Sequence, residues 1–279
     1  MSDRLSHLLR HAELRIEQFD VHSRNEMKTL NRTLPFYVMS YLKSGSAKLR
    51  IDGEEMALEP GTVTLIPPNV MHDHYKDTAD QTEFLWWHFT FEIEGVMDVM
   101  KMFRIPFVFQ LQDHAYFEDV FMAFMDSADA RIPSLPRSIL TRAKSLELLY
   151  IILNSALSQQ DAQKDVAKSD GFLAMLTRVV QSPEAPMTLQ QMADELHMHP
   201  TYVSNRFKEL FGKSPLQVQR EMRIQKAKTL LETSDLSVTE ISQRLGYSEL
   251  QNFTRLFKSY VGISPTQFRV LNRKWRVSK

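Results

Sequence analysis

The chain has 279 residues, of which 24% are charged and 43% hydrophobic, and 34 Lys and Arg balance 34 Asp and Glu. This length and composition predict a soluble protein with two domains, each able to bury a core. The absence of cysteine excludes disulfides, thiolate metal sites and cysteine nucleophiles. Charges run through residues 1–17 and no apolar run approaches the ~20 residues that cross a bilayer, so we expect a cytoplasmic protein without membrane contact.

The balanced net charge hides an asymmetry along the chain. Residues 170–279 hold 16 of the 34 Lys and Arg but only 10 of the 34 Asp and Glu, which leaves the first 169 residues negative. A positive domain suits a polyanionic partner, although a solvated surface explains such an excess equally well.

Short runs rich in β-branched and aromatic residues, broken by turns, occupy the first third of the chain. Asp52-Gly53 between two runs predicts a hairpin, and Pro60-Gly61 predicts another turn. Closely spaced strands of this kind are typical of a small β-sandwich or barrel. The expected strands lie within residues 15–21, 36–42, 46–53, 54–61, 62–68 and 84–91.

The middle of the chain changes to a helical pattern between Phe107 and Ser158. Ser145 to Leu157 is apolar on more than one side, which indicates either a core helix or an interface. Residues 159–169 (QQDAQKDVAKS) are polar and lack aromatic side chains, as expected of a linker.

The last third contains one helical unit twice. Met192, Leu196, Val203 and Phe207 recur as Ile241, Leu245, Phe253 and Phe257, and Gly212-Lys213-Ser214-Pro215 recurs as Gly262-Ile263-Ser264-Pro265. The offset changes from 49 to 50 residues across the central turn. A repeated helical unit with a turn at its centre predicts two helix-turn-helix modules.

Helix boundaries can be read within each copy. Thr188 and Ser237 are placed to cap the first helix of each module, Pro200 suits the first turn of a second helix, and Ser248 is expected to open its counterpart. The pattern of residues 221–232 predicts a further helix that would hold the modules at a fixed separation.

Polar side chains remain on the outer face of both second helices. Amide, hydroxyl and guanidinium groups can bond to base edges in the major groove, while a solvated helix face is the alternative for any single residue. Lys213, Lys226, Lys258 and Arg269 are candidates for phosphate contacts. The outward residues are Thr201, Ser204, Asn205 and Lys208 in the first copy and Leu250, Gln251, Asn252, Arg255 and Lys258 in the second.

This repeat resembles the DNA-binding domain of the AraC/XylS family of bacterial transcription regulators. The resemblance covers about 100 residues and includes Gly246-Tyr247-Ser248, the Phe-Lys of both second helices and the Gly-x-Ser-Pro that ends each copy. It implies that the outward residues named above contact DNA. The expected fold is α+β with two domains, a cupin-like β-barrel with helices in 1–158 and an all-α domain in 170–279, joined by the linker 159–169.

Residues 45–89 resemble the cupin-type sensor domain that precedes AraC-type DNA-binding domains, through Gly61-x5-Pro67-Pro68-x3-His72 and Trp86-x-His88-Phe89. The resemblance implies that the barrel binds an effector, often a sugar, through Arg32, His72, His74 and Trp86. Strand alternation puts His88 on the face of Trp86 and puts Trp87 on the opposite face. A core or surface role is an equally good interpretation for each of these residues.

A cupin-type metal enzyme fused to a DNA-targeting module is the alternative function. Metal cupins take a His-x-His pair and a Glu from a first motif, but Ile51 and Gly53 stand where those histidines would lie. We therefore expect no metal, no cofactor and no enzymatic activity.

The expected function is a sequence-specific DNA-binding transcription regulator that responds to a small-molecule effector. Resemblance to regulators of sugar catabolism implies an activator, with a repressor as the alternative. The expected partners are double-stranded DNA, a carbohydrate effector, a second copy of the chain and, for an activator, RNA polymerase.

Overall fold

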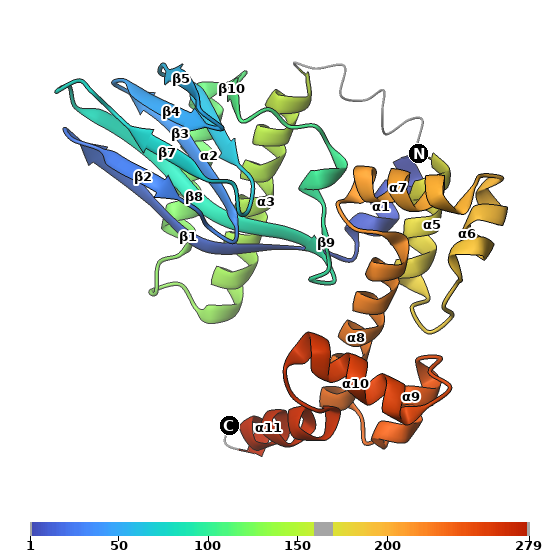
Figure 1. Ribbon diagram of the computed structural model, residues 1–279. Coiled ribbons are helices and arrows are strands. Elements are labelled where there is room, and N and C mark those ends of the chain that lie inside the picture. Colours follow the sequence, from blue (N-terminus) through green and yellow to red (C-terminus); the bar gives the residue numbers. More distant parts are fainter. Residues whose placement is uncertain (1, 159–169, 278–279) are drawn as a thin grey trace. The chain divides into compact units, whose positions relative to one another are not determined.

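The computed structural model describes residues 2–158 and 170–277, and the predicted linker 159–169 lies outside the described residues. Within the described residues the chain forms two compact units, one of residues 14–91 and 103–158 and one of residues 2–13, 92–102 and 170–277 (Figure 1). The first is rich in strands and the second is helical, in agreement with the α+β prediction.

Two antiparallel sheets form the strand-rich unit. The larger sheet has the order β1-β8-β3-β6-β10, with β9 on β8, and the smaller has the order β2-β7-β4-β5. The strands are β1 (Ala12–Arg24), β2 (Lys28–Arg32), β3 (Tyr37–Ser44), β4 (Ala47–Ile51), β5 (Glu54–Leu58), β6 (Thr62–Ile66), β7 (His72–Tyr75), β8 (Thr82–Ile93), β9 (Met97–Asp98) and β10 (Val108–Gln110).

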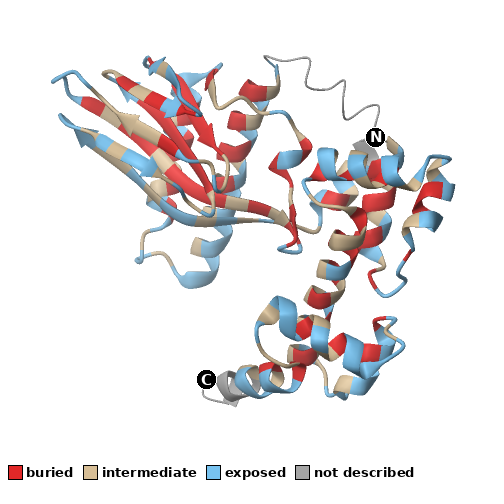
Figure 2. Ribbon diagram, in the orientation of Figure 1, coloured by how far each residue is buried: buried red, intermediate tan, exposed pale blue. Residues whose placement is uncertain are grey.

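An apolar cluster joins the two sheets. Val38 and Leu42 of β3 and Phe84 of β8 pack with Leu49 and Ile51 of β4, all at most 5% exposed. Because residues from both sheets share this core, the sheets face each other as the predicted sandwich or barrel requires. Buried residues accordingly run along β3, β6 and β8 (Figure 2).

The hairpin between β4 and β5 forms where the sequence predicts it. Asp52 and Gly53 both have positive φ, 51° and 83°. This is the backbone of a type I′ turn, whose twist matches that of the two strands. Register is then set from Ala47 opposite Leu58 to Ile51 opposite Glu54.

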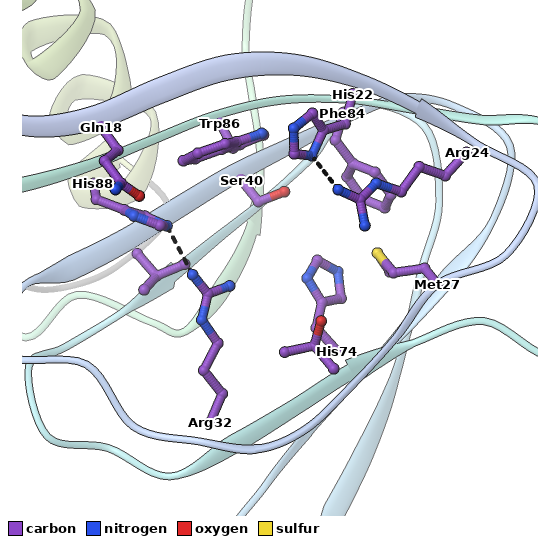
Figure 3. A pocket seen from close by; sticks show the side chains of 12 residues that line it. Gln18, His22, Arg24, Met27, Arg32, Ser40, His74, Phe84, Trp86 and His88 are labelled. Carbon is purple, nitrogen blue, oxygen red and sulfur yellow. Dashed lines mark hydrogen bonds between the residues drawn. The ribbon is translucent and has the colours of Figure 1, made fainter.

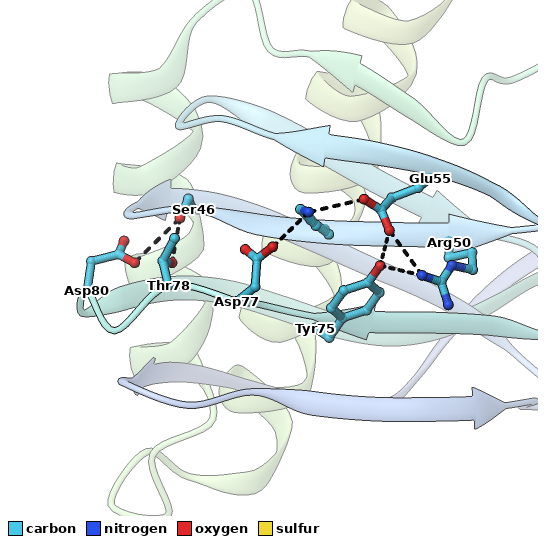
Figure 4. A network of polar contacts seen from close by, with 8 residues as sticks. Ser46, Arg50, Glu55, Tyr75, Asp77, Thr78 and Asp80 are labelled. Atoms are coloured by element: carbon cyan, nitrogen blue, oxygen red, sulfur yellow. Dashed lines mark hydrogen bonds and ion pairs between the residues drawn. The ribbon is translucent and has the colours of Figure 1, made fainter.

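Polar side chains cover the outer face of this hairpin (Figure 4). The Arg50 guanidinium donates to the Tyr75 hydroxyl at 2.8 Å and to Glu55 at 3.0 Å, while Lys48 pairs with Asp77 at 2.8 Å. Hydrogen bonds from Tyr75, Lys48 and Arg50 lower the pKa of Glu55 to about 2. Because these groups are largely exposed, their ion pairs add little to the free energy of folding. Their cross-strand contacts favour the observed register of the strands.

Two helices, α2 (His114–Ser127) and α3 (Ser134–Ser158), cover the other face of the larger sheet. Phe124 of α2 packs against Trp87 of β8 and Phe19 of β1, with ring centroids 5.9 and 4.6 Å apart. The segment from Phe107 was expected to be helical, but it first adds β10 to the edge of the larger sheet, paired with β6.

The helical unit contains the predicted pair of modules. Its helices are α1 (Ser2–Leu9), η1 (Met100–Met102), α5 (Asp170–Gln181), α6 (Leu189–Leu196), α7 (Pro200–Phe211), α8 (Pro215–Thr233), α9 (Val238–Arg244), α10 (Leu250–Val261) and α11 (Pro265–Val277). The modules are α6–α7 and α9–α10. Helix α8 packs against helices of both, so it is the predicted helix between them.

This unit departs from the expected domain boundaries because two earlier segments pack into it. Helix α1 lies on α5, where Arg4 pairs with Asp170 at 2.6 Å, and η1 lies on α7. No helix in the described part of the chain is long and apolar enough to span a membrane.

Candidate functional site

The strand-rich unit contains a cavity of about 240 Å³ between its two sheets (Figure 3). Side chains from five strands and one connecting segment line it, and they are mostly polar. The lining residues are Gln18, His22, Arg24, Met27, Thr29, Arg32, Val38, Ser40, His74, Phe84, Trp86 and His88.

Strand alternation on β8 places Trp86 in this lining. Phe84, Trp86 and His88 face the cavity, whereas Trp87 is fully buried on the opposite face against Phe124. The predicted separation of the two tryptophans is therefore confirmed. Trp86 lies 4.7 Å from the His88 ring, centroid to centroid, so the two rings form one aromatic wall.

Arg32 reaches the cavity because β2 contains a bulge. Thr29 already faces the cavity, so simple alternation would turn Arg32 away. The pairing of β2 with β7 shifts register between these residues, where Asn31 has a φ of 52° and its backbone N–H donates to Asp73 at 2.7 Å. A bulge re-aims the next side chain, and this one points Arg32 inward. Arg32 is the last residue of β2.

The Arg32 guanidinium fixes the tautomer of His88. Its Nη2 lies 3.3 Å from His88 Nε2. Because a guanidinium only donates, Nε2 accepts and the proton of a neutral ring must lie on Nδ1. That Nδ1 and the indole Nε1 of Trp86 are both buried without a hydrogen-bond partner in the described residues. Two N–H donors thus lack a partner beside the cavity.

His74 and His88 are neutral near pH 7. Burial, together with electrostatic interactions with His72 and Arg32, lowers the pKa of His74 to about 4. Burial and the charge of Arg32 lower that of His88 to about 4 as well. The permanent positive charge in the lining therefore belongs to the arginines.

A second arginine comes from β1, which the sequence did not single out. Arg24 donates to His22 Nδ1 at 3.2 Å, and His22 Nε2 contacts Asp20 at 3.2 Å. Gln18, His22 and Arg24 share one face of the strand. The available signal was the polar residues at every second position of this strand.

His72 is the one predicted effector residue outside the lining. It is 2% exposed, and its Nδ1 donates to the Val70 carbonyl at 3.1 Å. Its Nε2 has no partner in the described residues. The same described residues contain no cluster of three or more His, Asp or Glu able to hold a metal ion.

The first helix-turn-helix module begins with a capping box. The Thr188 hydroxyl accepts from the Gln191 backbone, while the Gln191 side chain accepts from the Thr188 backbone. Val203 and Phe207 are fully buried, and Phe211, also buried, completes the inner stripe of α7. On the outer face Thr201, Asn205 and Lys208 are exposed, and Ser204 is half-buried.

The second module repeats this arrangement, with Ser237 and Glu240 forming the capping box. Helix α10 begins at Leu250, two residues after the predicted Ser248, and buries Phe253 and Phe257. All five predicted DNA-binding side chains of this module are exposed: Leu250, Gln251, Asn252, Arg255 and Lys258.

The polar residues of α10 are linked along one face. Arg255 donates to the Asn252 side-chain oxygen at 3.3 Å, and Asn252 donates to Glu249 at 3.2 Å. Residues three apart on a helix are neighbours, so this chain holds the three side chains in a row. Glu249 was not predicted as part of the row.

Two of the candidate phosphate-binding residues are held by the protein itself. The Lys213 ammonium contacts Glu221 at 2.5 Å and the Val96 carbonyl at 2.7 Å, and Arg269 donates to the Leu236 carbonyl at 2.5 Å. Lys226 and Lys258 are exposed. The latter two remain the candidates for phosphate contacts.

Two families of known domains match the two parts of the chain. An "AraC-like ligand binding domain" matches residues 22–149, and a "Helix-turn-helix domain" matches residues 192–270. The first match includes the whole cavity lining except Gln18. The second includes both α7 and α10.

Known regulators are similar over most of the chain. The Msm operon regulatory protein of Streptococcus mutans is 21% identical and covers 84% of each chain. The arabinose operon regulatory protein of Salmonella typhimurium is 23% identical, over 84% of this chain and 83% of its own. The DNA-binding domain of AdpA in complex with a target DNA is 28% identical over 40% of this chain and all of that one, with a TM-score of 0.38.

These relatives are transcription regulators, not metal enzymes, so the enzyme alternative is set aside. An effector-binding domain matches the strand-rich part and a helix-turn-helix domain matches the helical part. The chain belongs to the AraC family of transcription regulators.

Proposed function

We propose that this chain is an effector-controlled activator of genes for carbohydrate use, acting on DNA in the cytoplasm. The observation that carries the proposal is the cavity beside Trp86, where N–H donors without partners meet an aromatic wall. A tryptophan face packs on the C–H surface of a sugar ring, and aimed polar groups bond its hydroxyls. Relatives named for arabinose and raffinose operons support a carbohydrate effector.

Helices α7 and α10 are the proposed readers of DNA. Thr201, Ser204, Asn205 and Lys208 would face the groove from α7, and Leu250, Gln251, Asn252, Arg255 and Lys258 from α10. Arg255 suits guanine and Asn252 suits adenine, while Leu250 can contact a thymine methyl group. Helix α8 has 19 residues, a rod of roughly 28 Å at about 1.5 Å per residue. That length is comparable with one turn of B-DNA, about 34 Å.

The proposed active form is a dimer built on α3. One side of this helix packs in the core through Leu148, Ile152 and Ala156. The opposite side exposes apolar residues at near-heptad spacing: Leu135, Ile139, Leu146 and Tyr150 are 70%, 61%, 42% and 62% exposed. Such a stripe suits the same helix of a second copy, and a dimer would double the number of DNA half-sites.

Effector control requires coupling between the cavity and the DNA-binding helices. A ligand shifts a conformational equilibrium only by its differential affinity for the two states. In the proposed function, the occupied cavity therefore favours the state that engages DNA and RNA polymerase.

The direct test selects operator DNA from random sequences with the full chain and then measures footprints and affinities with candidate sugars and sugar derivatives. A ligand that binds and changes the footprint or the affinity supports effector control. Identical footprints and affinities with every ligand that measurably binds would contradict it. Transcription from the selected operator, with and without that ligand, tests the activator role.

A further inference from the structure

The charges around the cavity indicate the chemical class of the effector, an inference that rests on the proposed function. Arg24 and Arg32 both line the cavity, and none of the twelve lining residues is an Asp or Glu. Among the described residues, each arginine donates a hydrogen bond to a histidine, His22 and His88 respectively, and neither forms an ion pair. The lining thus contains two cations and no anion.

Two carboxylates that contact lining residues or their neighbours, Asp20 and Asp73, are engaged outside the cavity. Asp20 contacts His22 Nε2 at 3.2 Å, on the far side of that ring from Arg24. Asp73 accepts the Asn31 backbone N–H at 2.7 Å and contacts Arg50 at 3.4 Å. Neither carboxylate lines the cavity or contacts Arg24 or Arg32.

The remaining polar atoms add donors to this positive lining. Trp86 Nε1 is a donor only, and the His88 tautomer set by Arg32 leaves a second N–H on Nδ1; both atoms lack partners in the described residues. A buried donor without a partner is costly, and a partly buried cation without an anion is more so. A ligand that brings negative charge and several acceptor lone pairs would satisfy all of these groups.

Size and the other lining side chains limit the ligand further. The cavity of about 240 Å³ has the volume of about eight water molecules in the liquid, which admits one sugar ring but not two. Ser40, Thr29 and Gln18 offer groups that both donate and accept, as hydroxyls require. Phe84 and the Trp86 ring supply apolar surface for the ring carbons.

We propose that the effector is a monosaccharide-sized sugar acid whose carboxylate is bound by Arg32, with Arg24 as the second cation. Arg32 has the leading role because it is half-buried and held by His88, whereas Arg24 is exposed. Figure 3 shows both arginine side chains extending toward the part of the cavity that His74, Ser40 and Trp86 border. A guanidinium fork binds a carboxylate with two parallel hydrogen bonds.

The test compares acids with neutral sugars of the same shape. Calorimetric titration of the full chain would use D-galacturonate against D-galactose and D-glucuronate against D-glucose. Each pair differs only in a carboxylate in place of a CH2OH group. We expect at least one acid to bind tenfold or more tightly than its partner.

Three variants assign that preference to the cavity. Arg32→Gln should weaken binding of the acid by about 10- to 100-fold, because a charge-assisted pair of hydrogen bonds is lost. The affinity for the neutral sugar should stay nearly unchanged. Arg32→Lys keeps the positive charge but lacks the guanidinium fork, so its affinity for the acid should lie between those of the unaltered protein and Arg32→Gln. Arg50→Gln is the matched control, since Arg50 lies in the exposed network of Figure 4 and should leave both affinities unchanged. Thermal unfolding checks that each variant is folded.

The outcomes separate this inference from the proposed function. A neutral sugar that binds as tightly as its acid, an acid affinity that Arg32→Gln does not change, or no binding by either acid would overturn the sugar-acid assignment. The footprinting experiment with other candidate ligands would then test effector control independently of the sugar-acid assignment. An acid that binds through Arg32 but leaves DNA affinity and footprint unchanged would support the assignment and contradict the proposed regulation.

Discussion

Acidification should destabilise the strand-rich unit between pH 7 and pH 5 through two cavity histidines. Burial lowers the pKa of His74 and of His88 from 6.5 to about 4. In the unfolded chain both rings bind a proton as the pH falls below 6.5, whereas in the folded chain they stay neutral until about pH 4. The unfolded state then binds more protons, so the free energy of unfolding decreases as the pH falls through this window.

The size of the effect follows from these values. A histidine whose pKa is 6.5 unfolded and about 4 folded loses roughly 2 kcal/mol of stabilisation by pH 5, and two such residues lose about 4 kcal/mol. Carboxylates with lowered pKa values, such as Glu55 at about 2, lose their contribution only below about pH 4.5, where the unfolded groups begin to bind protons. The window above pH 5 therefore isolates the histidines.

Guanidinium chloride unfolding at pH 7.5 and pH 5.0 measures the difference. Tryptophan fluorescence reports mainly on the strand-rich unit, because Trp86 and Trp87 are two of the three tryptophans. Over the same pH interval, the free energy of unfolding of His74→Gln should fall by about 2 kcal/mol less than that of the unaltered protein, since one titrating group has been removed. Ser40→Ala alters the same cavity without a titrating group and should retain the full loss. If the free energy of unfolding of His74→Gln falls as much between pH 7.5 and pH 5.0 as that of the unaltered protein, the assignment to buried neutral histidines is wrong.

Three further predictions concern DNA reading, helix capping and assembly. Arg255→Ala should weaken specific DNA binding by about 1–3 kcal/mol and relax the preference at one base position. Lys258→Ala should weaken binding to all sequences alike and reduce the slope of log affinity against log salt concentration by about 1. An unchanged base preference in Arg255→Ala would exclude a base contact by Arg255. Thr188→Ala should lower the stability of the helical unit by about 1 kcal/mol by circular dichroism, and Thr188→Ser should restore most of it. Ile139→Asp should convert the dimer to monomer in sedimentation experiments, while a wild-type monomer at all concentrations would exclude the α3 interface.

The helical unit could be predicted well because its signals are local. Capping residues, buried stripes and the Gly-x-Ser-Pro ends lie within a few residues of the boundaries they determine, so Thr188 and Ser237 were identified as caps from the sequence. The packing of α1 on α5 depends on residues more than 160 positions apart, such as Arg4 and Asp170. No periodicity in the sequence indicates such a contact.

The cavity was predicted only in part, because strand alternation fails at bulges. Trp86 and His88 follow alternation and were placed on one face. Arg32 is placed by the left-handed backbone of Asn31 and its bond to Asp73, a residue on another strand. The contribution of β1, with His22 and Arg24, depends on β1 lying beside β8 in the larger sheet, a pairing across about 60 residues that the sequence does not specify.

The two proposed reading helices differ in how far their side chains are prearranged. On α10 the row from Glu249 through Asn252 to Arg255 restricts the long Arg255 side chain before DNA is bound. Ordering an arginine side chain takes up to about 2 kcal/mol of rotamer entropy, so restriction in the free protein leaves less to be lost on binding. On α7 the outward Thr201 and Asn205 are short and have little rotamer entropy to lose, but they also reach less far into a groove. Greater reach together with prior ordering favours α10 as the helix that contributes more base specificity, with α7 contributing more to position.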